Sequence, residues 1–432
     1  RTKIVYIDDA YNAMQDRPIY HAKVVCTMAC YDNYTLFWHT KEFVKFEKVI
    51  DLQWENIVYV KDENREDAYK NYRGIGKDVV HVSWGQQNVT RLLKAAHLNE
   101  RNIKLTGHVG MDFLRSPLNR YYLSREELFP RYDLPLDKKI ILFASPYYGD
   151  QLSQDYIKGM CERFGDDWTE YYKFMCDSQQ IVLDWFEKVC KENPDIIVVF
   201  RPHPGHPSGV AEKLSNRYSN FRIISGESVK QWIVTCDEIY TGNSSVVVEA
   251  FFAKKMCQLL FPIPTTPGFE LKLITDSMKI TSYEEFRQSV FSGNQEFPTP
   301  KESIEEIYLI DWKTPNYIKF ANMAEKVFQD DSYRLTRKQL KDYKEYNRDE
   351  KRVRAFVNTP VIYDIYLSLL KDQKLQSNFL RNQRRIRKEK YDYLREFEKQ
   401  HEHELTSEEE IDSIINRIKY ALEDRDRQEK IK

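Results

Sequence analysis

The sequence lacks the features of a secreted, membrane-spanning or disulfide-stabilised protein. Its seven cysteines, an odd number among 432 residues, include no CxxC pair, which argues against a disulfide framework or a zinc site and favours a reducing compartment. No apolar run approaches the length of a membrane span, and residues 1–6 do not form a signal-peptide pattern. The formal net charge of −1 argues against nucleic-acid binding through overall charge. We therefore expect a cytoplasmic protein.

Short motifs that bind metals or diphosphates are also missing. The chain has no P-loop, no GxGxxG, no GxSxG and no Asp-x-Asp motif at a suitable strand end. His401 and His403 alternate with glutamates in a highly charged stretch, which is typical of solvated surface rather than of a metal site. We therefore expect no metal and no cofactor. Any charged leaving group would then be stabilised by Arg, His and a helix dipole.

The sequence does contain an alternation of short β-rich runs and amphipathic helices, which predicts an α/β fold with parallel sheets. A first unit is predicted over residues 1–137, with strands at 3–7, 35–38, 57–60, 79–82 and 103–105 and helical character at 18–30. A second unit is predicted over 138–312, with strands at 139–144, 196–200, 221–224, 238–241 and 256–261. The chain is long enough for both units to bury full cores.

The C-terminal part is predicted to be helical and highly charged. Residues 313–373 are expected to hold crossing helices that pack back on the two units, and residues 374–432 a charged helical tail. The tail combines a basic segment at 381–390 with an acidic helix at 408–427. It could be a solvated helix that packs or self-associates. Alternatively, its basic segment could make a peripheral contact with anionic lipid of the inner membrane.

The end of the strand at 196–200 carries an arginine and a histidine among prolines. Arg201, Pro202, His203 and Pro204 follow the strand directly, and the prolines restrict the backbone that presents the imidazole. An imidazole beside an arginine can donate to a phosphate or protonate it as it leaves. The alternative is a histidine that only hydrogen-bonds its own loop. Because ligands bind at the carboxyl ends of parallel strands, we favour the phosphate role.

The end of the strand at 238–241 carries small polar residues before an apolar helical pattern at 246–253. Asn243, Ser244 and Ser245 offer hydroxyls and backbone N–H groups to a phosphate, although a serine there is also an ordinary helix N-cap. Glu249 lies one turn further on the same face, where it could accept hydrogen bonds from a ribose or sugar hydroxyl. Otherwise it is a charge at a core edge that needs a partner.

These segments resemble GT-B glycosyltransferases, in which two Rossmann-like domains enclose a central cleft. RPHP, followed by SxxxWIxxCDEIYTGNSSVVVEAFFAKK, is similar to bacterial surface-carbohydrate enzymes. These are capsule and lipopolysaccharide transferases for 3-deoxy-manno-octulosonic acid (Kdo) and bacterial sialyltransferases, which use CMP-activated sugars. The stretch TGHVGMDFLRSPL resembles the domain junction of that group, and the likeness covers roughly residues 100–265.

The resemblance implies roles for the residues of the two strand ends. His203 and Pro204 would hold the CMP phosphate, Ser244 and Ser245 the phosphate or the sugar carboxylate, and Glu249 the ribose. The first unit would bind the acceptor, and the second the nucleotide sugar.

The resemblance also implies a catalytic carboxylate, acting as base or nucleophile. The candidates are Asp8 and Asp9, which follow the first predicted strand and could equally cap the next helix, and Asp150, which follows the strand at 139–144. Asp166 and Asp167 are weaker alternatives. The acidic-acidic-Gly base motif of sialyltransferases has only a partial counterpart here, since Ala10 follows the two aspartates.

The expected function is metal-independent transfer of an acidic sugar, with CMP-Kdo as first choice of donor, onto a lipid-linked glycan of O-antigen or capsule. A sialyltransferase and a CDP-glycerol-type glycerophosphotransferase remain open. A non-hydrolysing UDP-sugar epimerase shares the architecture, but nothing in the sequence favours a diphosphate. An alternative of another class is a non-catalytic scaffold of a polysaccharide synthesis complex. It predicts normal polymer without His203 and failure when residues 374–432 are deleted.

Overall fold

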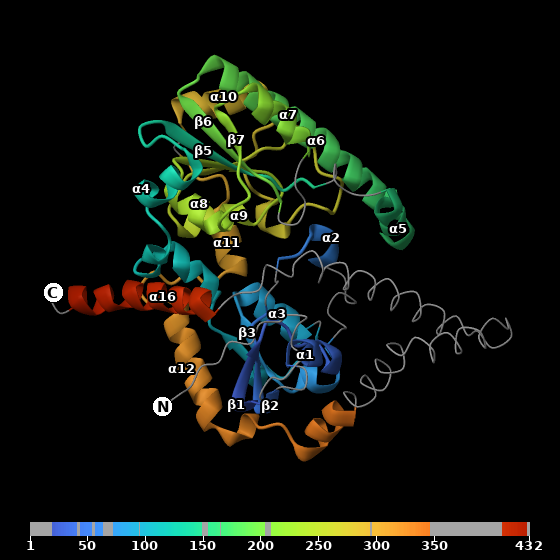
Figure 1. Cartoon of the computed structure of the whole chain (residues 1–432). Coiled ribbons are helices and arrows are strands. Elements are labelled where there is room, and N and C mark those ends of the chain that lie inside the picture. The colour runs from blue at the N-terminus through green and yellow to red at the C-terminus, as the bar shows by residue number, and fades with distance from the viewer. Residues whose placement is uncertain are drawn as a thin grey trace, which may run out of the picture.

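Two parallel β-sheets form the frame of the molecule (Figure 1). The computed structural model describes residues 20–40, 44–53, 57–63, 72–94, 96–148, 154–164, 166–203, 209–293, 296–345 and 408–429. Helices flank both sheets, and a cleft between them is lined by residues of both. The chain therefore has the predicted α/β fold of GT-B type, with a C-terminal helix.

The four-stranded sheet has the order β1-β2-β3-β4, and all neighbouring strands are parallel. Its strands are β1 (Tyr20–Thr27), β2 (Val44–Asp51), β3 (Val80–Ser83) and β4 (Ile103–Leu105). The helices of this unit, with 3-10 helices labelled η, are α1 (Asn33–Thr40), α2 (Val60–Glu63), η2 (Gly74–Lys77), α3 (Gln86–Lys94) and η3 (Glu100–Asn102).

Sequence patterns predicted this sheet only in part. The strands expected at 79–82 and 103–105 are confirmed as β3 and β4. The helical character expected at 18–30 is wrong, because most of that stretch is β1, and β2 has no counterpart among the predictions. Both strands carry lysines within their apolar runs, which hides the pattern by which buried strands are recognised.

Two other expected strands are wrong for local reasons. The strand expected at 35–38 lies in α1, where Asp32 accepts a hydrogen bond from the Thr35 backbone N–H (2.9 Å) and so caps the helix. The strand expected at 57–60 contains one isolated bridge, from Tyr59 to Leu271, before α2 begins. The strand expected at 3–7 lies outside the described residues.

The five-stranded sheet has the order β7-β6-β5-β8-β9 and is also parallel throughout. Its strands, all within about two residues of the predicted ranges, are β5 (Lys139–Ala144), β6 (Ile196–Arg201), β7 (Phe221–Ile223), β8 (Glu238–Thr241) and β9 (Cys257–Leu259). The helices of this unit are α5 (Gln154–Phe164), α6 (Asp166–Glu192), α7 (Gly209–Arg217), α8 (Val229–Thr235), α9 (Val246–Phe252), η8 (Lys272–Ile274), α10 (Tyr283–Ser292) and α11 (Lys301–Ile307).

Both faces of this sheet are buried, which is why its strands have continuous apolar runs. Ile141 and Phe143 of β5 pack with residues of α6, α7 and α10. Ile140 and Leu142, which point to the other face, pack with residues of α8 and α9. Figure 1 shows α6 and α7 on one side of the strands and α8 and α9 on the other.

The connection between the two sheets is made of short turns. It contains η4 (Val109–Leu114), η5 (Leu118–Tyr121), α4 (Arg125–Leu128) and η6 (Phe129–Tyr132). A capping box begins α4, in which the Ser124 N–H donates to Glu127 Oε2 (2.8 Å).

After α11 the chain returns to the first sheet. Helix α12 (Asn316–Gln329) packs on β1, β2 and η4 and is followed by η9 (Asp331–Tyr333). The fully buried ammonium of Lys48, on β2, donates to the carbonyl oxygens of Val327, Phe328 and Asp330 (2.9 Å each). A lysine from a distant strand therefore satisfies the carbonyl groups at the carboxyl end of α12. The boundaries expected at 137, 312 and 373 stay predictions.

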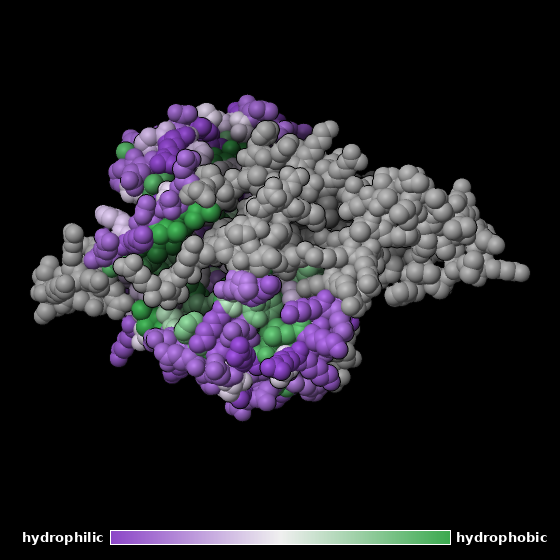
Figure 2. All heavy atoms as spheres, turned by 60° about the horizontal axis from the view of Figure 1, so that its bottom comes forward, coloured by the Kyte–Doolittle hydropathy of each residue, from purple (hydrophilic) through white to green (hydrophobic). Residues whose placement is uncertain are grey.

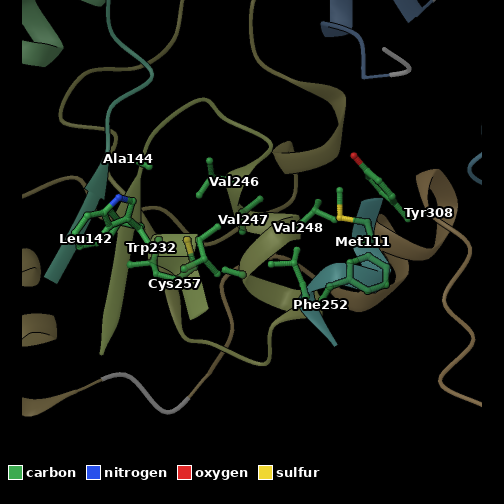
Figure 3. Packing of buried hydrophobic residues seen from close by; sticks show 14 of the residues in the cluster. Met111, Leu142, Ala144, Trp232, Val246, Val247, Val248, Phe252, Cys257 and Tyr308 are labelled. Carbon is green, nitrogen blue, oxygen red and sulfur yellow. The ribbon is translucent and has the colours of Figure 1, made fainter. Parts of the chain in front are cut away.

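One hydrophobic core joins the two units. It contains Val80 and Val82 from the first sheet and Leu142 and Ile239 from the second. Figure 3 shows Met111 of η4 and Tyr308, which follows α11, beside Val248 and Phe252 of α9.

The backbone of the turn after β3 lies directly against the backbone that follows α11. A Cβ added at Gly85 would lie 2.3 Å from the Ile307 carbonyl oxygen, so this turn requires glycine. The Leu309 N–H donates to the Trp84 carbonyl oxygen (2.6 Å) beside it.

The C-terminal helix α16 (Glu408–Glu429) confirms the helix expected at 408–427 and packs on η5. Arg417 donates to the Tyr121 carbonyl oxygen, and its guanidinium lies over the Tyr121 ring. Ile414 and Ile415 on α16 are exposed. No helix in the described part of the chain is long and apolar enough to cross a membrane. On the face in Figure 2, apolar residues (green) lie between regions dominated by hydrophilic ones (purple).

Candidate functional site

The polar strand ends expected to form a site meet at one edge of the five-stranded sheet. The chain enters this sheet at its centre with β5, proceeds outward through β6 and β7, and then returns to the other side of β5 with β8. The change of direction between β5 and β8 is a topological switch point, where parallel sheets open a crevice at their carboxyl ends. The carboxyl ends of β5, β6 and β8 all border a cavity of about 630 Å³.

This cavity, called the strand-end cavity below, brings together most of the predicted ligand-binding residues. Its lining includes Arg201, His203, Asn243, Ser244, Ser245 and Glu249. It also includes Pro202 and residues to which the sequence analysis gave no role: Tyr59, Ala144, Ser145, Pro146, Tyr148, Tyr171, Ser228, Val229, Val246 and Leu271. Pro204 and the candidate carboxylates Asp8, Asp9 and Asp150 lie outside the described residues, as do the side chains of Asp166 and Asp167.

Arg201 is held by the loop after β7. Its Nη1 donates to the carbonyl oxygens of Ser225 (3.2 Å) and Gly226 (2.8 Å). Burial lowers the pKa of Arg201, while Tyr132 and Glu227 oppose the shift, and the guanidinium remains a cation at neutral pH. Arg201 therefore brings a positive charge to the cavity wall and fixes the adjoining loop at the same time.

His203 lies against an aromatic wall of the strand-end cavity. Its ring centroid is 5.0 Å from that of Tyr148, with the two planes tilted by 42°. Tyr171, which also lines the cavity, stacks on Phe269, with centroids 4.5 Å apart. A histidine next to flat aromatic rings suits a ligand that combines a phosphate with a planar base.

Asn243 lines the cavity and also holds a neighbouring loop in place. Its Nδ2 donates to the Phe269 carbonyl oxygen (2.7 Å), and its Oδ1 accepts from the Leu271 N–H (2.9 Å). The segment held in this way also bonds to the first unit, because the Val60 N–H donates to the Glu270 carbonyl oxygen (2.9 Å). Asn243 therefore fixes a loop that bridges the two units.

The two serines differ in how their hydroxyls are used. Ser244 Oγ accepts from the Val246 N–H (3.3 Å). Ser245 is the N-cap of α9, but its side chain makes no capping hydrogen bond, and it lines the cavity. Because α9 has only seven residues, its dipole is a small contribution, and the hydroxyl itself is the group that Ser245 offers to a ligand.

Glu249 has a partner that the sequence did not identify. Its Oε1 lies 2.9 Å from the Nζ of Lys230 on α8, and both side chains are largely buried. The expectation that a charge at this position needs a partner is thus met by a helix that is adjacent in space but not in sequence. The ion pair lies at the wall of a second cavity.

The second cavity, called the interdomain cavity below, has a volume of about 530 Å³ and adjoins the first. Ser245, Glu249 and Leu271 line both cavities. The four-stranded unit contributes residues that follow its strands, among them Leu52, Trp84 and the stretch 107–111. The two cavities therefore share part of their wall and lie next to each other between the units.

His108 is a titratable group that the four-stranded unit places in the interdomain cavity. Its ring packs on Trp84, with centroids 4.0 Å apart. Burial and the positive charge of Lys230 lower the pKa of His108 to about 4, so the ring is neutral at physiological pH. Sequence reasoning placed His108 in a domain junction without a role; its position after β4, at a strand's carboxyl end, was the signal that could have identified it.

Comparisons with known proteins add little to this picture. No protein-family model matches the chain, and no curated protein matches it. The match to a variant of the wall teichoic acid polymerase TagF covers 71% of this chain and 73% of that chain, at 14% identity and a TM-score of 0.43. The match to a UDP-N-acetylglucosamine 2-epimerase covers 71% of this chain and 72% of that chain, at 15% identity and a TM-score of 0.40. The match to S. aureus MnaA with UDP covers 71% of this chain and 74% of that chain, at 13% identity and a TM-score of 0.37. Similarity at this level does not transfer an activity.

Proposed function

We propose that the protein is a glycosyltransferase that uses a CMP-activated acidic sugar, with CMP-Kdo as the first choice of donor. The acceptor is a lipid-linked surface glycan, of O-antigen or capsule type, reached from the cytoplasmic side of the inner membrane. The reaction needs no metal ion: charge on the departing phosphate is balanced by protein side chains.

One observation carries the proposal. Arg201, His203, Ser244 and Ser245 border a single cavity at the switch point of a parallel sheet. A cation, an imidazole and two hydroxyls at this place match the needs of one phosphate group. Aromatic side chains in the same cavity offer a surface for a pyrimidine ring.

Each residue has a role in the proposed reaction. Arg201 and His203 stabilise the negative charge that develops on the CMP phosphate as the bond to the sugar breaks, and His203 can supply a proton to it. Ser244 and Ser245 hold the phosphate or the sugar carboxylate, and Glu249 accepts from the ribose hydroxyls. A carboxylate from the set Asp8, Asp9 and Asp150 acts as base or nucleophile.

Isothermal titration with CMP tests the core of this proposal. The wild-type protein is expected to bind CMP with the same affinity in EDTA as without it. His203→Ala is expected to weaken binding about tenfold or more, because a hydrogen bond to a charged group is lost. The matched control is His21→Ala, which removes an exposed imidazole on β1 and leaves binding unchanged. A wild-type protein that does not bind CMP refutes the proposal.

A donor panel then decides the class of the transferred group. CMP-Kdo, CMP-sialic acid, CDP-glycerol and a UDP-sugar are compared in a transfer assay with the same acceptor. Preference for CMP-Kdo supports the proposal. Preference for CDP-glycerol assigns the protein to the glycerophosphotransferases instead, and turnover of none of them, with normal polymer in a His203→Ala strain, favours the scaffold.

A further inference from the structure

The interdomain cavity has an unusually apolar wall for a site expected to hold a sugar polymer. The described residues that line it include Leu52, Ile57, Val82, Met111, Leu271 and Phe320. Trp84 and Tyr308 add two stacked aromatic rings, with centroids 5.6 Å apart. A hydroxyl-rich saccharide that filled this space would leave many of its hydroxyls without partners, which is costly. The wall therefore suits a ligand with an apolar face.

Polar groups of this cavity gather where it meets the strand-end cavity. Glu249 and Ser245 line both cavities, and Lys230 pairs with Glu249 at 2.9 Å. Lys230 and Glu249 are the charged residues among the described lining residues, and they neutralise each other. A ligand of the interdomain cavity would thus meet polar groups mainly at the end that faces the nucleotide.

His108 supplies a hydrogen-bond donor with a defined position in this wall. Its Nδ1 accepts from the Gly110 backbone N–H (2.9 Å). In a neutral imidazole one nitrogen accepts and the other carries the proton, so the proton is on Nε2. The ring is held in place by contact with Trp84, at 4.0 Å between centroids. His108 can therefore donate to a ligand but is not set up to remove a proton from it.

We propose that the interdomain cavity binds an acceptor through an apolar or aromatic group, and that His108 determines acceptor specificity by donating from Nε2 to the polar end of that acceptor. This inference rests on the proposed transferase function, since it treats the strand-end cavity as the donor site. It adds to the lipid-linked acceptor proposed above the requirement that an apolar or aromatic group of that molecule lies in the interdomain cavity, as the aglycone of a glycoside would.

The first test compares two small probes that differ only in the aglycone. Phenyl β-D-galactopyranoside and methyl β-D-galactopyranoside are titrated into the full chain saturated with CMP. The phenyl glycoside is expected to bind about tenfold more tightly, because its ring buries more apolar surface. Phe320→Ala is expected to remove most of this difference, whereas Phe291→Ala, an exposed ring on α10, leaves it unchanged. Equal affinity for the two probes, or no binding of either, overturns the inference.

The second test uses two amides that reach to different nitrogens of the replaced imidazole. The side-chain NH₂ of His108→Gln can take the place of Nε2–H, whereas that of His108→Asn lies near Nδ1. We expect His108→Asn to bind the phenyl glycoside about tenfold more weakly, and His108→Gln to stay close to wild type, because one hydrogen bond separates them. Equal affinities in the two variants contradict the role of His108. So does a pH–rate profile in which the wild-type rate falls as a basic group is protonated, if that fall is absent in His108→Gln, because His108 would then act as a base.

The outcomes separate failure of this inference from failure of the proposed function. CMP affinity is measured for every variant in parallel, and thermal melting shows whether each is folded. If the wild type binds CMP and the variants behave alike towards the glycosides, only the inference fails. If the wild type does not bind CMP, the proposed function fails, whatever the glycosides do.

Discussion

The two sheets of this molecule bury their strands in different ways. In the five-stranded sheet, β5 sends alternate residues to two apolar clusters, and β6 is buried along nearly its whole length. In the four-stranded sheet, most of β1 is exposed or half-buried, and fully buried Lys48, Asp51 and His81 lie on β2 and β3. The first kind of strand depends on apolar neighbours of any identity. The second depends on specific polar partners.

These partners come from distant parts of the chain or from neighbouring strands. Lys48 is satisfied by the end of α12, about 280 residues further along. Asp51 accepts from His81 Nδ1 (2.8 Å) and from the Gln53 N–H (2.9 Å). A buried polar group is tolerated only when it is paired, so the four-stranded sheet needs the returning C-terminal segment in a way that the five-stranded sheet does not.

The largest expected effect comes from replacing Lys48, which links the four-stranded sheet to the end of α12. Lys48→Met removes the ammonium that three carbonyl oxygens of the α12 terminus accept from, and it should lower the free energy of unfolding by about 3 kcal/mol. Chemical denaturation followed by circular dichroism measures the change.

A lysine of the other sheet provides the matched comparison. Lys139 on β5 donates to Glu238 Oε1 and to the Val290 carbonyl oxygen (2.7 Å each), but its side chain is 31% exposed. Lys139→Met should therefore cost only about 1 kcal/mol, because water can replace the ammonium. Equal losses in the two variants would mean that the sheets do not differ in this respect.

The second effect concerns acid sensitivity of the four-stranded unit. The pKa of His108 is about 4 in the folded protein, against an ordinary value of 6.5, because burial and Lys230 disfavour the charged ring. The unfolded chain therefore binds this proton more tightly. Stability is complete above pH 6.5 and falls as the pH drops towards about 4, by up to about 3 kcal/mol.

Replacing the imidazole should remove this part of the pH dependence. His108→Gln is expected to flatten the curve of unfolding free energy between pH 6.5 and 4, with Lys230 and Glu249 still paired. His21→Gln, which removes an exposed ring from β1, is the control and should leave the slope as it is. A wild-type slope retained in His108→Gln would show that other groups cause it.

The smallest effect separates a helix cap from a ligand group within the five-stranded unit. Ser228 caps α8 by accepting from the Gln231 N–H (3.2 Å), whereas Ser245 makes no capping bond. Ser228→Ala should cost about 1 kcal/mol of stability. Ser245→Ala should change it by less than about 0.5 kcal/mol and yet weaken CMP binding. Loss of stability without loss of affinity in Ser245→Ala would mean that this serine is structural.

Sequence patterns predicted the two halves of the cleft unequally. Arg201, His203 and Ser245 follow apolar strands and could be assigned to one edge, because parallel strands end together. His108 was left without a role although it follows a predicted strand. Lys230 could not be assigned, since no local pattern sets it apart from the 66 lysines and arginines of the chain. Whether Asp8, Asp9 or Asp150 completes the site is still a prediction.

What the sequence determined by itself is local: where the strands of the five-stranded sheet begin and end, that strands alternate with helices, and which polar residues stand at the strand ends. Periodicity and turn chemistry act over a few residues, so short segments carry that information. Only the tertiary structure decided that Lys230 neutralises Glu249, that Lys48 completes α12, and that His108 packs on Trp84 in the cleft. These choices depend on burial and charge pairing between segments far apart in the chain, which no local pattern encodes.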